Sequence, residues 1–134
     1  MVRGLIVGTV SIGFLCALSV AAPAEPPANA DPALAPWFQA QKVPGTSASC
    51  CDVSDGRAVE YRIVADHYEV YLTKDTFPWI EQEGWKAVDP QSILVGQENP
   101  TGRAIAWVAK REYRFLHRIF PRGTIMCFKP PNEV

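Results

Sequence analysis

The stretch YRIVADHYEVYL, residues 61–72, decides the fold class that we expect for this chain. On either side of Ala65–Asp66 its apolar residues recur at every second position, which is the period of a β-strand with one buried face. Valine, isoleucine and tyrosine, which favour strands, are frequent in it. The stretch therefore predicts two antiparallel strands joined by a tight turn at Ala65–Asp66.

Three further segments favour strands, and turn-forming residues separate them. They are residues 86–88, which end before Asp89–Pro90, residues 103–109, which follow the turn sequence QENPTG, and residues 124–128, which precede Pro130–Pro131. Few segments between them have the period of a helix. The sequence predicts an all-β fold, a small curled sheet or barrel of about five short strands and of SH3-like size.

The N-terminus has the pattern of a secretory signal peptide. Arg3 is followed by the uncharged, mostly apolar run 4–22, and Ala22–Pro23–Ala24 places small residues where a signal peptidase cuts. We expect residues 1–24 to be removed on export, and a second such tripeptide at 28–30 offers cleavage after Ala30 instead. An uncleaved anchor is the competing interpretation, because the run approaches the ~20 residues that span a bilayer. The expected location is secreted or periplasmic.

The rest of the chain divides into a linker, one small domain and a tail. Residues 25–48 contain many prolines and alanines, and proline neither continues a helix nor fits a central strand, so we expect an extended tether. Residues 49–131 are expected to form the β domain, and residues 132–134 a tail. A domain of about 80 residues buries little more than ~60% of the surface of its unfolded chain, so a covalent link would help to stabilise it.

The cysteines offer that link. An exported protein meets an oxidising compartment, where cysteines form disulfides. Cys16 lies in the expected signal peptide, which leaves Cys50, Cys51 and Cys127. We expect Cys127 to bond either Cys50 or Cys51, which closes a long loop and contributes about 4 kcal/mol in the chain-entropy treatment. The odd number leaves one thiol unpaired or bonded to another molecule.

Four segments of the chain together resemble a known group of proteins. They are CCDVSDG (50–56), GWKAVDPQSIL (84–94), NPTGRAIAW (99–107) and CFKPP (127–131). In this combination the chain is similar to short secreted bacterial proteins of unknown function that share a CCD-x-x-DG start, an NP-x-GR-x-x-x-W strand and a CF-x-PP end. The resemblance spans most of residues 50–131 and implies a periplasmic or extracellular location, but no activity. Residues 110–122 depart from the group, in which a shorter connection is expected.

The sequence holds few residues suited to catalysis or metal binding. Adjacent cysteines point apart on an extended chain, whereas zinc ligands are usually spaced by two to four residues, and Asp52 and Asp55 do not follow the pattern of a calcium loop. Asp55–Gly56 is better explained as a turn. His67 and His117 belong to no motif with a serine or cysteine nucleophile. We therefore expect no enzyme, no metal site and no cofactor.

Charge is unevenly distributed along the chain. Residues 31–109 hold six Lys/Arg and eleven Asp/Glu, a net charge of −5, whereas residues 110–129 hold six Lys/Arg and one Glu, a net charge of +5. The basic part alternates charged with aromatic and aliphatic residues, which is typical of a short amphipathic helix near 112–120 or, nearly as well, of two arms of a hairpin. Arg111, Arg114 and Arg118 are the candidate contacts for an anionic partner.

These observations favour an exported, non-catalytic binding or structural domain of the cell envelope. Its expected partner is an envelope protein or an anionic membrane surface, and not a nucleic acid, because the protein is exported. The alternative is a thiol-exchange or metal-handling protein that uses the unpaired cysteine of the Cys50–Cys51 pair. Trp79, Trp85 and Trp107 are expected in the core, and Trp37, on the tether, is a binding contact if it is exposed.

Overall fold

The computed structural model describes residues 31–115 and 117–132, so the expected signal peptide lies outside the described residues. The described residues form eight short strands: β1 (Arg57–Ala58), β2 (Glu60–Val64), β3 (His67–Leu72), β4 (Gly84–Ala87), β5 (Ile105–Val108), β6 (Tyr113–Phe115), β7 (Arg118–Phe120) and β8 (Ile125–Lys129). The helical segments are η1 (Pro32–Leu34), α1 (Ala35–Ala40), α2 (Cys50–Val53) and η2 (Pro90–Ser92). No helix in this part of the chain is long and apolar enough to cross a membrane.

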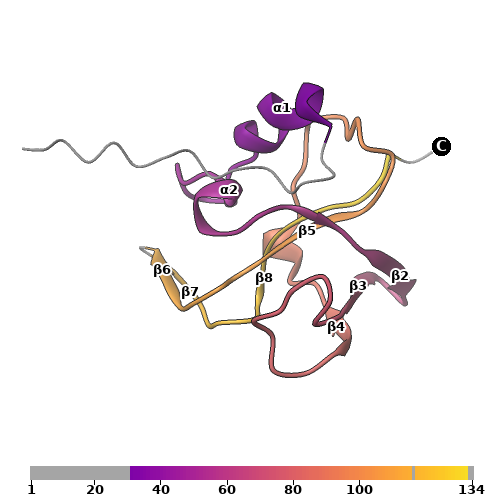
Figure 1. Ribbon diagram of the computed structural model, residues 1–134, viewed down its shortest axis with the longest axis vertical. Coiled ribbons are helices and arrows are strands. Elements are labelled where there is room, and N and C mark those ends of the chain that lie inside the picture. Colours follow the sequence, from indigo (N-terminus) through magenta and orange to yellow (C-terminus); the bar gives the residue numbers. More distant parts are fainter. Residues whose placement is uncertain (1–30, 116, 133–134) are drawn as a thin grey trace, which may run out of the picture.

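The expected all-β class is confirmed, and the strands divide into three small antiparallel sheets (Figure 1). Their strand orders are β1-β5-β8, β2-β3-β4 and β6-β7. The described strands do not close into a barrel. All five predicted strands are present, and β1, β6 and β7 add to them.

The stretch that decides the fold class forms a hairpin as expected. β2 and β3 pair antiparallel from Glu60↔Tyr71 to Val64↔His67, and Ala65–Asp66 is the turn, with Ala65 at a φ of 53°. Only Val59 separates β2 from β1, and its N–H donates to the carbonyl oxygen of Ala104 at 3.0 Å. One nearly continuous extended segment therefore belongs to both three-stranded sheets.

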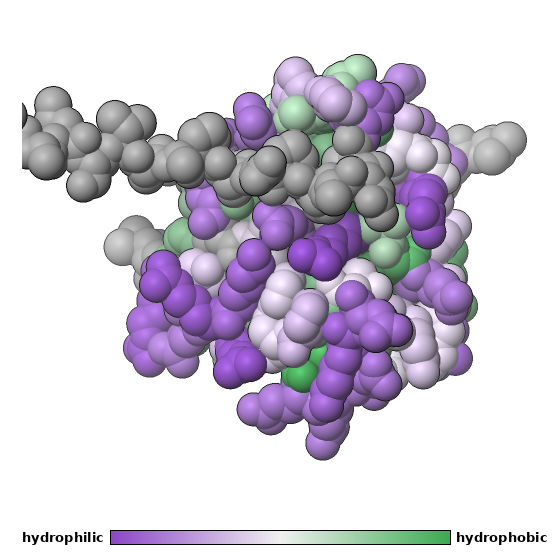
Figure 2. Space-filling model, in the orientation of Figure 1, coloured by the Kyte–Doolittle hydropathy of each residue, from purple (hydrophilic) through white to green (hydrophobic). Residues whose placement is uncertain are grey.

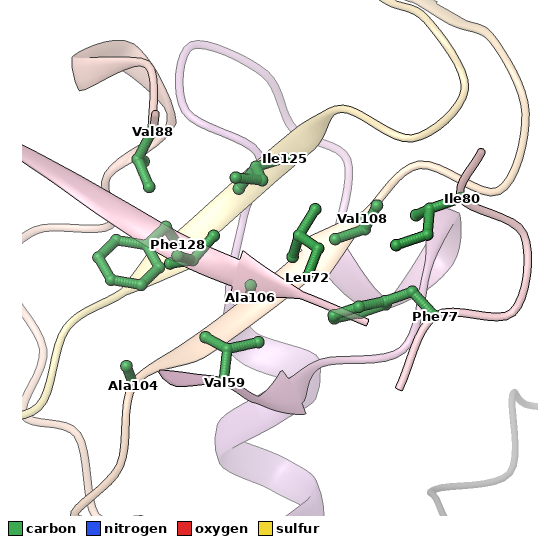
Figure 3. Packing of buried hydrophobic residues seen from close by; sticks show 11 residues of the cluster. Val59, Leu72, Phe77, Ile80, Val88, Ala104, Ala106, Val108, Ile125 and Phe128 are labelled. Carbon is green, nitrogen blue, oxygen red and sulfur yellow. The ribbon is translucent and has the colours of Figure 1, made fainter. Parts of the chain in front are cut away.

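Strand β5 forms the centre of the molecule, because all four of its residues are buried. Ala106 and Val108 point into a first apolar cluster, which fills the space between β3 and the pair β5–β8 (Figure 3). Ile105 and Trp107 point to the opposite side, into a second cluster with Cys50, Cys127, Val43, Leu94, Ala109, Phe120 and Met126. The continuous apolar run of this strand is what burial on both faces requires.

The prediction of an extended tether over 25–48 is wrong for residues 31–48, the part of it that the structure describes. Asp31 caps a 3₁₀ turn by accepting the N–H of Ala33 at 2.9 Å, and α1 follows it directly. Trp37 and Phe38 of α1 pack on the second cluster, with ring centroids 6.4 Å and 5.9 Å from that of Trp107. Proline is tolerated in the first turn of a helix, so Pro32 and Pro36 do not prevent these helices.

The basic segment forms a hairpin, the second of the two structures expected for it, and its described residues hold no helix near 112–120. β6 and β7 pair in the register Tyr113↔Phe120, Arg114↔Ile119 and Phe115↔Arg118. Alternation along each strand places Tyr113, Phe115 and Phe120 on one face, which packs on the second cluster. A helix would not bring these three rings to one face as directly, because they lie two and five residues apart.

Candidate functional site

The sulfur atoms lie where α2 meets β8. Cys50 and Cys127 are bonded, with Cα atoms 6.2 Å apart, and neither is exposed to solvent. The expected bridge to Cys127 is confirmed, and the structure selects Cys50. Ser49 caps α2: its hydroxyl accepts the N–H of Cys51 at 3.3 Å, and its own N–H donates to the carboxylate of Asp52 at 3.2 Å. The disulfide suggests a non-reducing compartment.

The unpaired thiol belongs to Cys51, on the same short helix. It is half-buried and donates to the carbonyl oxygen of Phe38 at 3.3 Å. Burial raises the pKa of the Cys51 thiol above its ordinary value, and the carboxylates of Asp55 and Asp52 act in the same direction. A thiol with a raised pKa holds little thiolate near neutral pH, so this environment does not favour thiol exchange.

The two aspartates near the cysteines are engaged in contacts of the fold. Asp52 completes the capping box of α2, and Asp55 accepts from the Nζ of Lys110 at 3.2 Å and lies 3.7 Å from Arg57. Within residues 31–115 and 117–132, no three His, Cys, Asp or Glu side chains are placed to hold a metal ion.

The two histidines lie far apart along the chain and on different elements. His67, at the start of β3, is 3.7 Å from a carboxylate oxygen of Asp66 and 3.5 Å from one of Glu69. His117 is exposed in the turn between β6 and β7. Among the described residues, no hydrogen bond or ion pair joins either histidine to a serine or cysteine.

The basic hairpin β6–β7 projects from the body of the molecule (Figure 1), and its side of the surface is strongly hydrophilic in Figure 2. Its outer face presents Arg114 and Ile119. The side chain of Arg114 is 70% exposed, and Ile119 is 57% exposed. Arg114 donates from Nε to Glu112 at 2.6 Å. Arg111, just before the hairpin, is exposed with its guanidinium 5.1 Å from the ring centroid of Tyr113.

Arg118 lies on the inner face of the hairpin and holds it to η2. Its side chain is only 17% exposed, and its two terminal nitrogens donate to the carbonyl oxygen of Gln91 at 3.1 Å and to the hydroxyl of Ser92 at 3.0 Å. Asp89 is 3.5 Å away, and the guanidinium lies 4.4 Å from the ring centroid of Phe120. The three predicted arginines therefore do not share one surface, because Arg118 points to the opposite face from Arg114.

Two clefts flank the hairpin and share Arg118 and Gln91. One, of about 500 Å³, lies between β7–β8 and the segment from β4 to η2, and Lys86 and Asp89 are among its polar residues. The other, of about 920 Å³, lies between the hairpin turn at His117 and the loop 44–47. Both clefts therefore border the basic hairpin.

The tryptophans only partly follow the expectation from the sequence. Trp107 is fully buried and Trp79 packs at the edge of the first cluster. Trp85 is instead 37% exposed on the outer face of β2-β3-β4, where Arg62 lies 4.1 Å from its ring centroid and Tyr71 makes an edge contact. Trp85 alternates with Lys86, but the sequence does not show which of the two faces the core. Trp37 is part of the packing on the second cluster.

No model of a protein family, no curated protein and no solved structure matches this chain significantly.

Proposed function

We propose that this chain is an exported binding domain that acts without catalysis and docks through hairpin β6–β7 on an anionic surface of the cell envelope. The observation that carries the proposal is the charge of the hairpin. Residues 110–122, which are the hairpin and its flanking residues, hold five Lys/Arg and one Glu, a net charge of +4, and the hairpin projects from an otherwise acidic body. Such a local field attracts anionic surfaces and steers their approach.

The outer face of the hairpin supports a membrane surface as the partner. It places the exposed Ile119 directly opposite Arg114, so an apolar side chain and a cation lie next to each other on this face. Interfacial segments combine these two properties, since the apolar side chain enters the headgroup boundary while the cations contact anionic lipid. The inner face is fixed to the core by Phe120 and Arg118, so the outer face is presented on a supported scaffold.

The test measures binding to vesicles of phosphatidylglycerol and phosphatidylcholine at low salt. The variant Arg111→Gln/Arg114→Gln removes two exposed cations and leaves Arg118 in place. At about 1 kcal/mol for each basic residue near an anionic surface, its affinity should fall about 30-fold. Binding of the unmodified protein should weaken as salt rises, because the Debye length shortens from ~30 Å at 0.01 M to ~10 Å at 0.1 M.

The matched control is Lys42→Gln/Lys74→Gln, which removes the same charge from exposed positions outside the hairpin. It should bind nearly as well as the unmodified protein. If the unmodified protein does not bind these vesicles, or if both double variants lose affinity equally, the hairpin is not the docking element.

Export is tested separately, by peptide mapping of the protein produced in a bacterial host from the full coding sequence. We expect it in the periplasm or medium, cleaved after Ala24 or Ala30, with Cys50 linked to Cys127. A full-length protein with reduced cysteines in the cytosol would contradict the proposal.

A further inference from the structure

Strand β2 is an edge strand that is exposed along its whole length. It is the first strand of the sheet β2-β3-β4, it lies at the margin of the molecule (Figure 1), and all five of its residues are exposed. Ile63 is 64% exposed and Tyr61 is 40% exposed. Apolar residues on a free sheet edge are what a pairing strand would cover.

The backbone groups of Tyr61 and Ile63 point to this free edge. The turn Ala65–Asp66 has two residues, so the flanking residues Val64 and His67 exchange backbone hydrogen bonds. By alternation, the backbone N–H and C=O of Arg62 also point to β3, whereas those of Tyr61 and Ile63 point away from it. The N–H of Val59 agrees with this direction, because it donates to Ala104 on the edge opposite β3.

The strand carries few of the usual features that prevent edge pairing. Residues 60–64 contain no proline and no lysine, and their register with β3 has no bulge. The one cation, Arg62, is directed to its own sheet: its Nε donates to Glu69 at 2.6 Å, and its guanidinium lies 4.1 Å from the ring centroid of Trp85. A second strand therefore meets little repulsion at this edge.

We propose that a second copy of the chain pairs with this edge, β2 against β2, antiparallel around a two-fold axis at Arg62. The two residues with free backbone groups stand symmetrically about Arg62, so Tyr61 is placed opposite Ile63 of the partner subunit, and Ile63 opposite Tyr61 of the partner subunit. Each of these pairs exchanges two backbone hydrogen bonds and joins an aromatic to a β-branched side chain. The interface is isologous and joins the two sheets into one of six strands.

The charges of the strand agree with self-pairing. The two copies of Arg62 face each other across the axis, and each is neutralised by Glu69 of its own sheet. The pairing ends at the turn after Val64 on one side and at Val59 on the other, where the segment before β5 already occupies the edge. The self-complementary part of the edge is therefore confined to residues 60–64.

A cross-linking experiment tests the register in a Cys51→Ser background. In this pairing the two copies of Arg62 lie opposite each other without mutual backbone hydrogen bonds. Their Cα atoms are about 4.5 Å apart, a distance that a disulfide can bridge. Arg62→Cys should therefore form a covalent dimer under mild oxidation. Glu60→Cys is the control and should not cross-link. The two copies of residue 60 are displaced from each other by four residues, about 13 Å along the strand. No dimer with Arg62→Cys, or equal cross-linking of both variants, would overturn the proposal.

Arg62→Cys also removes contacts with Glu69 and Trp85, so a second measurement leaves Arg62 intact. Light scattering over a range of concentrations should show a monomer–dimer equilibrium for the unmodified protein. Ile63→Lys should raise the dissociation constant at least tenfold without lowering the melting temperature, whereas Ile119→Lys, at another strongly exposed isoleucine, should keep the dimer. Two results would contradict pairing with a second copy. One is a protein that stays monomeric at all concentrations, even if its edge pairs with a strand of another protein. The other is a dimer that Ile63→Lys does not weaken.

Discussion

The indole ring of Trp107 lies directly against Gly56 and leaves no space for a side chain there. A Cβ atom on Gly56 would stand 2.6 Å from Cε2 and 2.7 Å from Cζ2 of the ring. Trp107 is fully buried at the centre of the second cluster, so it has little freedom to move away. The contact fixes the segment between α2 and β1 on strand β5.

Replacing Gly56 with alanine should therefore destabilise the protein. Overpacking a well-packed site usually lowers the free energy of unfolding by about 1–3 kcal/mol, and urea unfolding measures it. The atoms in the way belong to the indole, so Gly56→Ala should cost less in a Trp107→Phe background, which makes the two changes non-additive. Additive effects would show that the loss of stability in Gly56→Ala does not arise from the indole ring.

Removing the disulfide should destabilise the protein strongly. Cys50 and Cys127 are 77 residues apart in sequence, and a loop of this size corresponds to about 4 kcal/mol in the chain-entropy treatment. Cys127→Ser should lower the melting temperature under oxidising conditions, and a reducing agent should abolish the difference from the unmodified protein. Cys51→Ser is the matched control and should melt close to the unmodified protein. Equal melting of all three proteins would show that the bond does not stabilise the fold.

The thiol of Cys51 should react slowly in the native state. Burial raises its pKa, so at a given pH less thiolate is present than in an unfolded chain. Alkylation followed against pH should show a midpoint above that of the urea-unfolded protein. Because the folded pKa is raised, the stability linked to this group is complete below the ordinary thiol pKa and is lost as pH rises through the folded value. Native labelling as fast as that of the unfolded chain would contradict this environment.

Arg118 should matter for stability and Arg114 should not. Arg118→Gln breaks two charge-assisted hydrogen bonds, to Gln91 and Ser92, on a side chain that is mostly buried. Such bonds contribute about 1.5–3 kcal/mol each, and solvent compensates part of the loss. Arg114→Gln removes an exposed pair with Glu112, which typically contributes less than about 1 kcal/mol. Equal melting of the two variants would show that Arg118 does not hold the hairpin to η2.

The sequence is a good guide where one local pattern determines the structure. Residues 60–72 combine period-two alternation with a turn, and no tertiary contact is needed to decide between strand and helix. The bridge to Cys127 is predictable because only three cysteines lie outside the expected signal peptide. The choice between Cys50 and Cys51 is not, because it depends on which side of the short helix α2 faces β8.

Other features depend on packing that the sequence does not display. Residues 113–120 fit a helix or a hairpin, and the burial of Phe120 on the second cluster decides between them. The prolines around Trp37 predict an extended chain, although Asp31 followed by Pro32 is a recognisable start of a helix. Arg118 looks like Arg114 in the sequence, and only the register of the hairpin places them on opposite faces.

The extended segment through Val59 gives the molecule a mechanical property. Because β1 and β2 are covalently consecutive, a pull applied at the margin of one sheet travels along the backbone into β1, and the hydrogen bonds of the other sheet pass it on to β5 and β8. The Cys50–Cys127 bond ties β8 to α2 at that point. Tension on the outer strand is thus borne by a centre that a disulfide crosslinks.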